Sequence, residues 1–163
     1  MRQYRTDSPE AMARIIALSM LVDGGLDKTE LDVIHHHSVL EHIGISTATF
    51  NDIVQELCED MLQSMPGYHL GRIDLDDELT ERSIDAMLIE IQDPQHRKFL
   101  LRMMLAVVDA DNYLSDSETI LLSRAMQIWD LELTKESKQA HNPNDMLTQQ
   151  SNARPPSIIE MHF

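Results

Sequence analysis

The chain has 163 residues, which is enough for one globular domain with a hydrophobic core. Its formal net charge is −15, from 13 basic and 28 acidic residues, and such a surface repels nucleic acid and anionic membranes, which are bound mainly through Lys and Arg. The charge suits cations or basic protein partners, and solubility explains it equally well. No apolar run reaches the roughly 18 residues that span a membrane, and no signal peptide opens the chain, so we expect a cytoplasmic protein.

Composition favours an all-helical fold. Aromatic residues make up 4% of the chain and Gly occurs only 5 times, while Met, which fills irregular gaps between helices, occurs 11 times. The single Cys58 makes no internal disulfide and is expected to be a small buried hydrophobe. We therefore expect an all-α protein, a compact orthogonal helical bundle of about six to eight helices.

Capping residues and helix breakers mark the expected helices in chain order. Ser8-Pro9 predicts the start of the first helix, and Gly24-Gly25 predicts its end. The later helices are expected over 27–44, from Thr47 or Thr49 to Pro66, from Asp76 or Asp77 to Gln92, from Asp93-Pro94 to about Asp111, and from Ser115 onward.

One side of each expected helix is apolar at the spacing of an α-helix, and these sides should form one shared core. The inward positions are Met12, Ile15, Ile16, Ser19 or Met20, and Val22; Leu31, Ile34 and Leu40; Phe50, Ile53, Val54, Leu57, Met61 and Leu62; Leu79, Met87, Leu88 and Ile91; Phe99, Leu100, Met103, Val107 and Val108; and Leu121, Leu122, Ala125, Ile128 and Trp129.

The chain changes character after Leu133. Residues 135–163 are rich in Gln, Asn, Ser and Pro, and their charges cancel, so the whole net charge of −15 lies within residues 1–134. We expect a helical domain over 1–134, followed by a polar C-terminal tail over 135–163 that is mostly flexible or forms one short helix.

An acidic motif, Asp-x-x-Leu-x-x-x-Glu, occurs twice in the sequence. The first copy runs from Asp23 to Glu30 and the second from Asp111 to Glu118, 88 residues later. Apolar positions around the two copies match at the same offset. Because two copies are too few for a solenoid, they predict two pseudo-repeated halves of one domain, each built on a helix–loop–helix corner.

Much of this motif has a purely structural explanation. Asp27 and Ser115 suit the N-cap position of the helix that follows each corner. Glu30 and Glu118 lie three residues later, where the Glu of a capping box accepts a hydrogen bond from the amide of the cap residue. The two Glu residues are thereby explained without a ligand.

Asp23 and Asp111 are placed against the helix dipole. Each is expected in the last turn of a helix, where a carboxylate costs a few tenths to about 1 kcal/mol. A Ca²⁺ or Mg²⁺ ion, which prefers carboxylate and carbonyl oxygens, compensates for this cost. Neither loop contains His or Cys, so nothing favours zinc. The candidate metal ligands are Asp23 and Glu30 at one corner, and Asp109, Asp111 and Glu118 at the other.

The two motifs, with IGIS and WDLEL following them, resemble the TerB-like domain of tellurite-resistance proteins over roughly residues 8–134. This resemblance implies an α-helical bundle, a cytoplasmic role in bacterial responses to tellurite and metal stress, and divalent-metal binding by acidic residues that are here Asp23, Glu30, Asp111 and Glu118. The chain departs from the family pattern at Asn112, where Gly is usual, and in its polar tail.

Other chemistry has little support in the sequence. No nucleophile motif, phosphate loop or Cys/His pair appears, so we expect no enzyme. The consecutive His35, His36 and His37 point in different directions on a helix and do not converge on one ion. The first hypothesis is a non-catalytic TerB-like stress-response module that binds divalent cations at two acidic corners and acts through protein partners. The second is a metal-free structural protein-interaction domain whose acidic motifs are helix caps.

Overall fold

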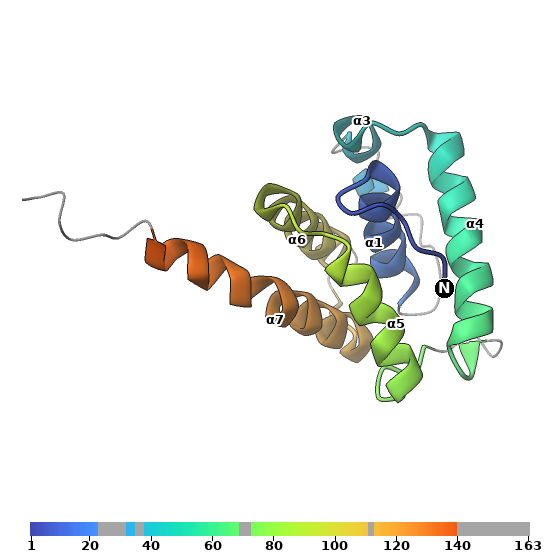
Figure 1. Ribbon diagram of the computed structural model, residues 1–163. Coiled ribbons are helices and arrows are strands. Elements are labelled where there is room, and N and C mark those ends of the chain that lie inside the picture. Colours follow the sequence, from blue (N-terminus) through green and yellow to red (C-terminus); the bar gives the residue numbers. More distant parts are fainter. Residues whose placement is uncertain (23–31, 35–37, 69–72, 111–112, 140–163) are drawn as a thin grey trace, which may run out of the picture.

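The computed structural model describes residues 1–22, 32–34, 38–68, 73–110 and 113–139, with 130–139 as backbone. These residues form helices and no strand (Figure 1). The helices are α1 (Pro9–Leu21), α3 (Val39–Ile43), α4 (Thr47–Ser64), α5 (Glu78–Ile89), α6 (Pro94–Asp109) and α7 (Asp116–Gln139). The expectation of an all-α helical bundle is therefore confirmed, and no described helix is long and apolar enough to cross a membrane.

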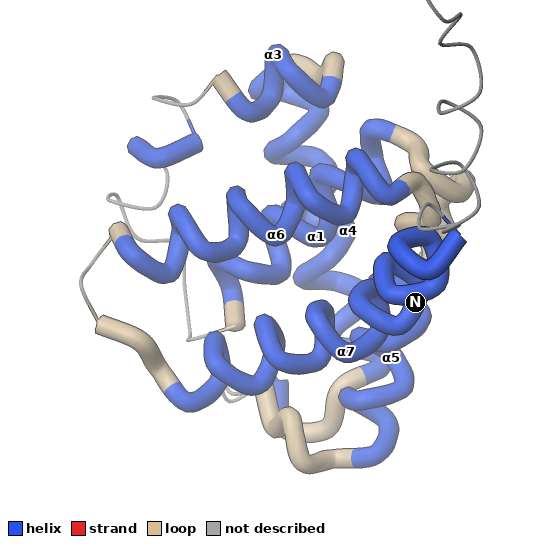
Figure 2. The backbone as a smooth tube through the Cα atoms, turned by 90° about the vertical axis from the view of Figure 1, so that its left-hand side faces the viewer, coloured by secondary structure: helices blue, strands red, loops and turns tan. Residues whose placement is uncertain are grey.

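Helix α1 is the centre of the bundle. It packs against α3, α4, α5 and α6 and lies between α4 and α6 in Figure 1. Every residue from Ala11 to Leu21 is buried, so this helix has no solvent-facing side. Seen from the side, α6 and α7 lie next to each other at the edge of the bundle (Figure 2).

Capping side chains start the helices where the sequence predicts. Ser8 Oγ accepts a hydrogen bond from the amide of Ala11 at the start of α1. Asp77 does the same for Thr80 in α5, and Asp93 Oδ1 accepts from Gln95 N at 2.7 Å in α6. These bonds satisfy amides that have no partner within the helix, which explains why such local signals are reliable.

The prediction of a single helix over 27–44 is wrong, because the chain turns at Ser38. This residue has φ +49°, in the left-handed region, and α3 begins only at Val39. The run His35-His36-His37-Ser38-Val39 consists of residues with weak helix propensity, which favours a break. Gly44 ends α3 with φ +82°, as its position predicts.

Most of the expected core positions that are described are buried, and two are exposed to solvent. Five others are partly buried against the core: Val54, Phe99, Met103, Val108 and Ile128. Leu31 lies outside the described residues. Leu62 of α4 is 55% exposed and Leu79 of α5 is 54% exposed. Each lies next to a residue that does face the core, Met61 in α4 and Thr80 in α5. One residue along a helix turns the side chain by about 100°, so a neighbour of a buried position lies at the surface. Cys58 is partly buried against the core.

The repeat in the sequence has a counterpart in the helices. Helix α1 ends at Leu21 and α6 ends at Asp109, the same offset of 88 residues that separates the two motifs. Both helices also begin at Pro after a capping side chain. Helix α7 continues to Gln139, past the expected domain boundary at Thr134, and in Figure 1 its C-terminal part extends beyond the other helices.

Trp129 joins α7 to α5. Its side chain is fully buried, and its Nε1 donates a hydrogen bond to the carbonyl oxygen of Leu88 at 3.0 Å. The one polar atom of the indole is thereby satisfied inside the core, as a buried Trp requires.

A buried arginine lies in the middle of α1. The side chain of Arg14 is 2% exposed and forms an ion pair with Glu90. Its Nη1 donates to the carbonyl oxygen of Arg2 at 2.6 Å, and its guanidinium lies 4.6 Å from the centre of the Tyr4 ring. Arg14 Nε is the one buried side-chain N or O atom without a hydrogen-bond partner among the described residues.

The N-terminal segment, residues 1–7, covers Arg14 and is held in place by polar contacts. The backbone amide of Arg2 donates to Asp60 Oδ2 at 2.8 Å, and the Tyr4 hydroxyl donates to Glu56 Oε2 at 2.6 Å. Burial and the bond to Glu56 both raise the pKa of Tyr4. Asp7, at the end of the segment, accepts hydrogen bonds from the amides that precede α6. Burial opposes ionisation of Asp7, but those amides and His96 hold its pKa below the usual value.

Replacing Glu90 by Gln should destabilise the fold strongly. The change leaves the Arg14 charge buried without its counter-charge, which lowers the free energy of unfolding by about 3 kcal/mol. The control is Glu78→Gln, which removes the exposed pair with Arg82 and should change it by less than about 0.5 kcal/mol. Urea denaturation measures the free energy of unfolding of both variants. Equal losses would show that the buried ion pair contributes no more to stability than the exposed one.

Candidate functional site

The corner between α6 and α7 contains a complete capping box. The amide of Ser115 donates to Glu118 Oε2 at 2.8 Å, and the amide of Glu118 donates to Ser115 Oγ at 3.1 Å. Glu118 is only 2% exposed. Its carboxylate is therefore turned back to the start of α7, as the structural explanation of the motif predicts.

Asp109 occupies the other side of the same corner. It is the last residue of α6 and is exposed to solvent. The carbonyl groups at this helix end give a negative field, and the last turn of α6 contains no basic residue. An exposed carboxylate thus lies in the last turn of α6, which contains no basic residue.

Only two of the five expected metal ligands, Asp109 and Glu118, are among the described residues. Asp23, Glu30 and Asp111 lie outside the described residues, as do His35, His36 and His37. Among the residues that are described, no group of three or more His, Cys, Asp or Glu side chains is arranged to hold a metal ion. Ca²⁺ or Mg²⁺ binding at the two corners therefore stays a prediction.

A hollow lies beside Asp109, and we refer to it as the α6 hollow. Its volume is about 540 Å³. The lining residues are Leu105, Ala106, Val108, Asp109, Tyr113 and Leu114. Leu105 and Leu114 are each 54% exposed and Tyr113 is 70% exposed. Three large exposed side chains thus border one hollow, together with the carboxylate of Asp109.

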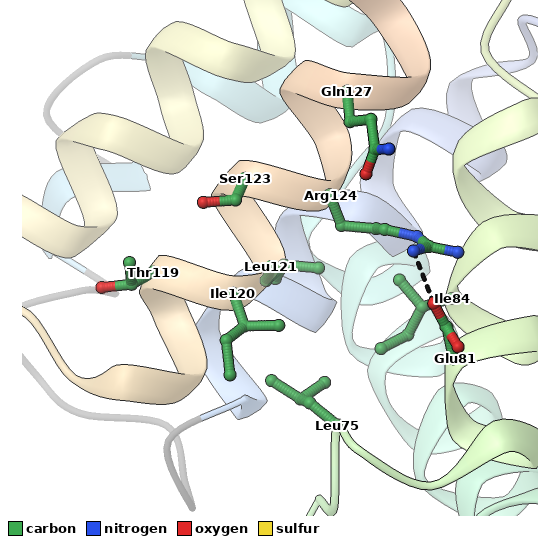
Figure 3. Close-up of a pocket in the computed structure, with 9 residues that line it drawn as sticks. All are labelled: Leu75, Glu81, Ile84, Thr119, Ile120, Leu121, Ser123, Arg124 and Gln127. Carbon is green, nitrogen blue, oxygen red and sulfur yellow. Dashed lines mark ion pairs between the residues drawn. The ribbon is translucent and has the colours of Figure 1, made fainter.

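A second depression, the α5–α7 pocket, lies between those two helices and has a volume of about 240 Å³ (Figure 3). The side chains of Leu75, Ile84 and Ile120 form its apolar part. At its edge Arg124 is paired with Glu81 and Asp85, at 2.5 Å from each carboxylate. Because two acids neutralise Arg124, this pocket offers a ligand apolar contact and little charge.

The single cysteine is held in a structural contact. The Tyr68 hydroxyl donates to Cys58 Sγ at 3.6 Å. Burial, together with this bond, raises the pKa of Tyr68 to about 12. The tyrosine is thus a neutral donor at physiological pH, and this pair supplies no base that activates the thiol.

Compared with protein-family models, curated proteins and solved structures, the chain matches none of them. The TerB-like resemblance of the two motifs accordingly stays a prediction.

Sequence reasoning did not identify the α6 hollow. Leu105 was not among the expected core residues, and Leu114 was interpreted as part of the acidic motif. A signal was nevertheless present, because Tyr113-Leu114 places two large apolar residues in a short loop between two helices. Such residues are unusual in a tight connection unless something covers them.

The role of Glu118 can be tested by two substitutions. Glu118→Gln keeps the acceptor of the capping box and should change the free energy of unfolding by less than about 0.5 kcal/mol, whereas Glu118→Ala should lower it by about 1 kcal/mol. Thermal denaturation measures the difference. A similar loss in both variants would show that the negative charge, and not the cap, is what Glu118 contributes.

Proposed function

We propose that this protein is a non-catalytic, TerB-like helical module that acts in the cytoplasm by binding protein partners during tellurite or metal stress. It binds no nucleic acid, because its surface is strongly acidic. Its enzyme-like features are few: among the described residues, the α5–α7 pocket is lined by no His or Cys.

The α6 hollow is the observation that carries this proposal. Leu105 and Leu114 expose more than half of their surface beside a cavity large enough to receive several side chains. Burying such apolar surface against a partner contributes roughly 25 cal/mol per Å². A protein whose only need is solubility gains nothing from this arrangement.

A second proposed activity is divalent-cation binding at the two corners. It is favoured by Asp109, which is exposed at a helix end that has no basic residue in its last turn. The capping role of Glu118 argues that the ligands at this corner are Asp109 and Asp111 with backbone carbonyls, not Glu118.

Partner binding can be tested by photo-crosslinking in cells that produce the protein. A photoreactive amino acid at Leu114 should give an adduct of one discrete mass, and its yield should rise on exposure to tellurite. The same group at Leu62, an equally exposed leucine on α4, is the control and should give none. Absence of adducts from both positions would contradict a partner-binding function, and adducts only from Leu62 would move the binding surface to α4.

Cation binding predicts a change in thermal stability. Millimolar Ca²⁺, Mg²⁺ or Mn²⁺ should raise the melting midpoint, because an ion at 100 times its Kd adds about 2.7 kcal/mol. The Asp23→Asn/Asp111→Asn double variant should lose this response. The control, Asp52→Asn/Asp76→Asn, removes two acids from exposed positions elsewhere and should keep it. An unchanged melt with all three ions would leave the metal-free module as the better hypothesis.

A further inference from the structure

The two halves of the protein differ in how their central helices are covered. Helix α1 packs against α4, and the N-terminal segment lies over Arg14. Helix α6, its counterpart in the repeat, packs mainly against α1 and α7. In Figure 2, α6 lies at the near side of the bundle with α1 behind it, and no described helix covers its near side.

Equivalent positions on the two helices show the difference residue by residue. Arg102 and Leu105 of α6 are exposed. Moving back by the repeat offset of 88 residues leads to Arg14 and Ala17 of α1, which are 1% and 0% exposed. The side of the helix that is buried on α1 is therefore exposed to solvent on α6.

In the first half, α1 is covered by α4 together with the N-terminal segment. Helix α4 is amphipathic, and its buried apolar residues Phe50, Ile53, Leu57 and Met61 repeat at helical spacing. Acidic residues accompany them: Asp60 accepts a hydrogen bond from Arg2, and Glu56 accepts one from Tyr4, whose ring lies against Arg14. The N-terminal segment, which these acids of α4 hold in place, thus covers the arginine-bearing side of α1, and α4 packs beside it.

The sequence of the second half does not repeat the pattern of α4. At the offset of 88, the apolar stripe of α4 corresponds to Lys138, His141, Asp145 and Gln149, all polar. Pro143 corresponds to Gln55, in the middle of α4, where proline breaks a helix. The sequence that follows α7 therefore does not repeat the apolar stripe of α4.

We propose that the open side of α6 is the docking site for an amphipathic helix of another protein, with an apolar stripe and acidic residues beside it. This inference rests on the proposed partner-binding function and names its surface and the class of partner. The apolar residues of the incoming helix enter the α6 hollow next to Leu105, Val108 and Leu114.

Charge complementarity supports an acidic helix. Lys98 and Arg102 are both exposed on α6, and they share one stripe with Leu105 at spacings of four and three residues. They are two of only 13 basic residues in a chain of net charge −15. Asp109, which also lines the hollow, lies seven residues, or about 10 Å, further along α6 than Arg102. Screening at physiological salt acts beyond about 8 Å, so the acids of the incoming helix belong at the end marked by Lys98 and Arg102.

The probe is a fluorescein-labelled synthetic peptide of residues 46–65, which carries the α4 pattern, added to the full chain in reducing buffer. Fluorescence anisotropy should show saturable binding, weakened at least tenfold by Leu105→Asp and several-fold by Arg102→Glu. Leu62→Asp, at an equally exposed leucine of α4, is the matched control and should bind as the wild type does. A peptide of the same composition with its stripe scrambled should not bind. Circular dichroism checks that each variant is folded.

Four results would overturn the inference. No peptide binding, or equal binding to the Leu105→Asp variant, would exclude this side of α6 as the helix site. A chain with Ile158, Ile159 and Phe163 replaced by Ser that binds the peptide much more tightly would identify its own C-terminal residues as the occupant. A dimer in sedimentation that Leu105→Asp abolishes would identify a second copy instead.

The proposed function has a separate outcome. If crosslinking from Leu114 finds a partner while the peptide does not bind, the partner-binding function stands and only the helix inference fails.

Discussion

The rest of the fold depends on the burial of α1 on all sides. A helix with no exposed side needs neighbours around its whole circumference, and α3, α4, α5 and α6 supply them. It also leaves no route to water for a long polar side chain, so the charge of Arg14 must be met inside the bundle. The charge is compensated by the carboxylate of Glu90, by the carbonyl oxygen of Arg2 and by the ring of Tyr4. Because Arg2 and Tyr4 belong to the N-terminal segment, these contacts fix the path of that segment.

The duplicated architecture is therefore only approximately symmetric. Both central helices end at the same offset, and each carries an arginine at the equivalent position. In the first half, that arginine is buried and the surrounding surface is closed by the chain itself. In the second half, Arg102 remains exposed, and Leu105 and Leu114 remain open beside it.

Features that depend on nearby residues were predictable from the sequence. The caps at Ser8, Asp77 and Asp93, and the capping box of Glu118, need only a few neighbouring residues to form. The break at Ser38 was not predicted, because apolar spacing continues across it and only the weak propensity of the surrounding residues opposes a helix. Helix caps can therefore be predicted from a few neighbouring residues. A helix break that depends on several weak and opposing preferences cannot.

Features that depend on distant residues were missed. The burial of Arg14 requires Glu90, 76 residues away, and the exposure of Leu62 and Leu79 depends on which helices lie opposite them. The same limit applies to the α6 hollow, because its openness depends on which helices pack beside α6. Apolar periodicity states that a residue can be buried, but the neighbouring helices decide whether it is.

Trp129 gives the molecule a built-in optical reporter. It is the single tryptophan of the chain, it is fully buried, and its indole N–H is bonded across the interface between α7 and α5. Its emission therefore arises from one defined, water-free environment, and any event that separates these two helices must shift that emission to longer wavelength. The movement of α7 against the bundle is thus observable in the unlabelled protein.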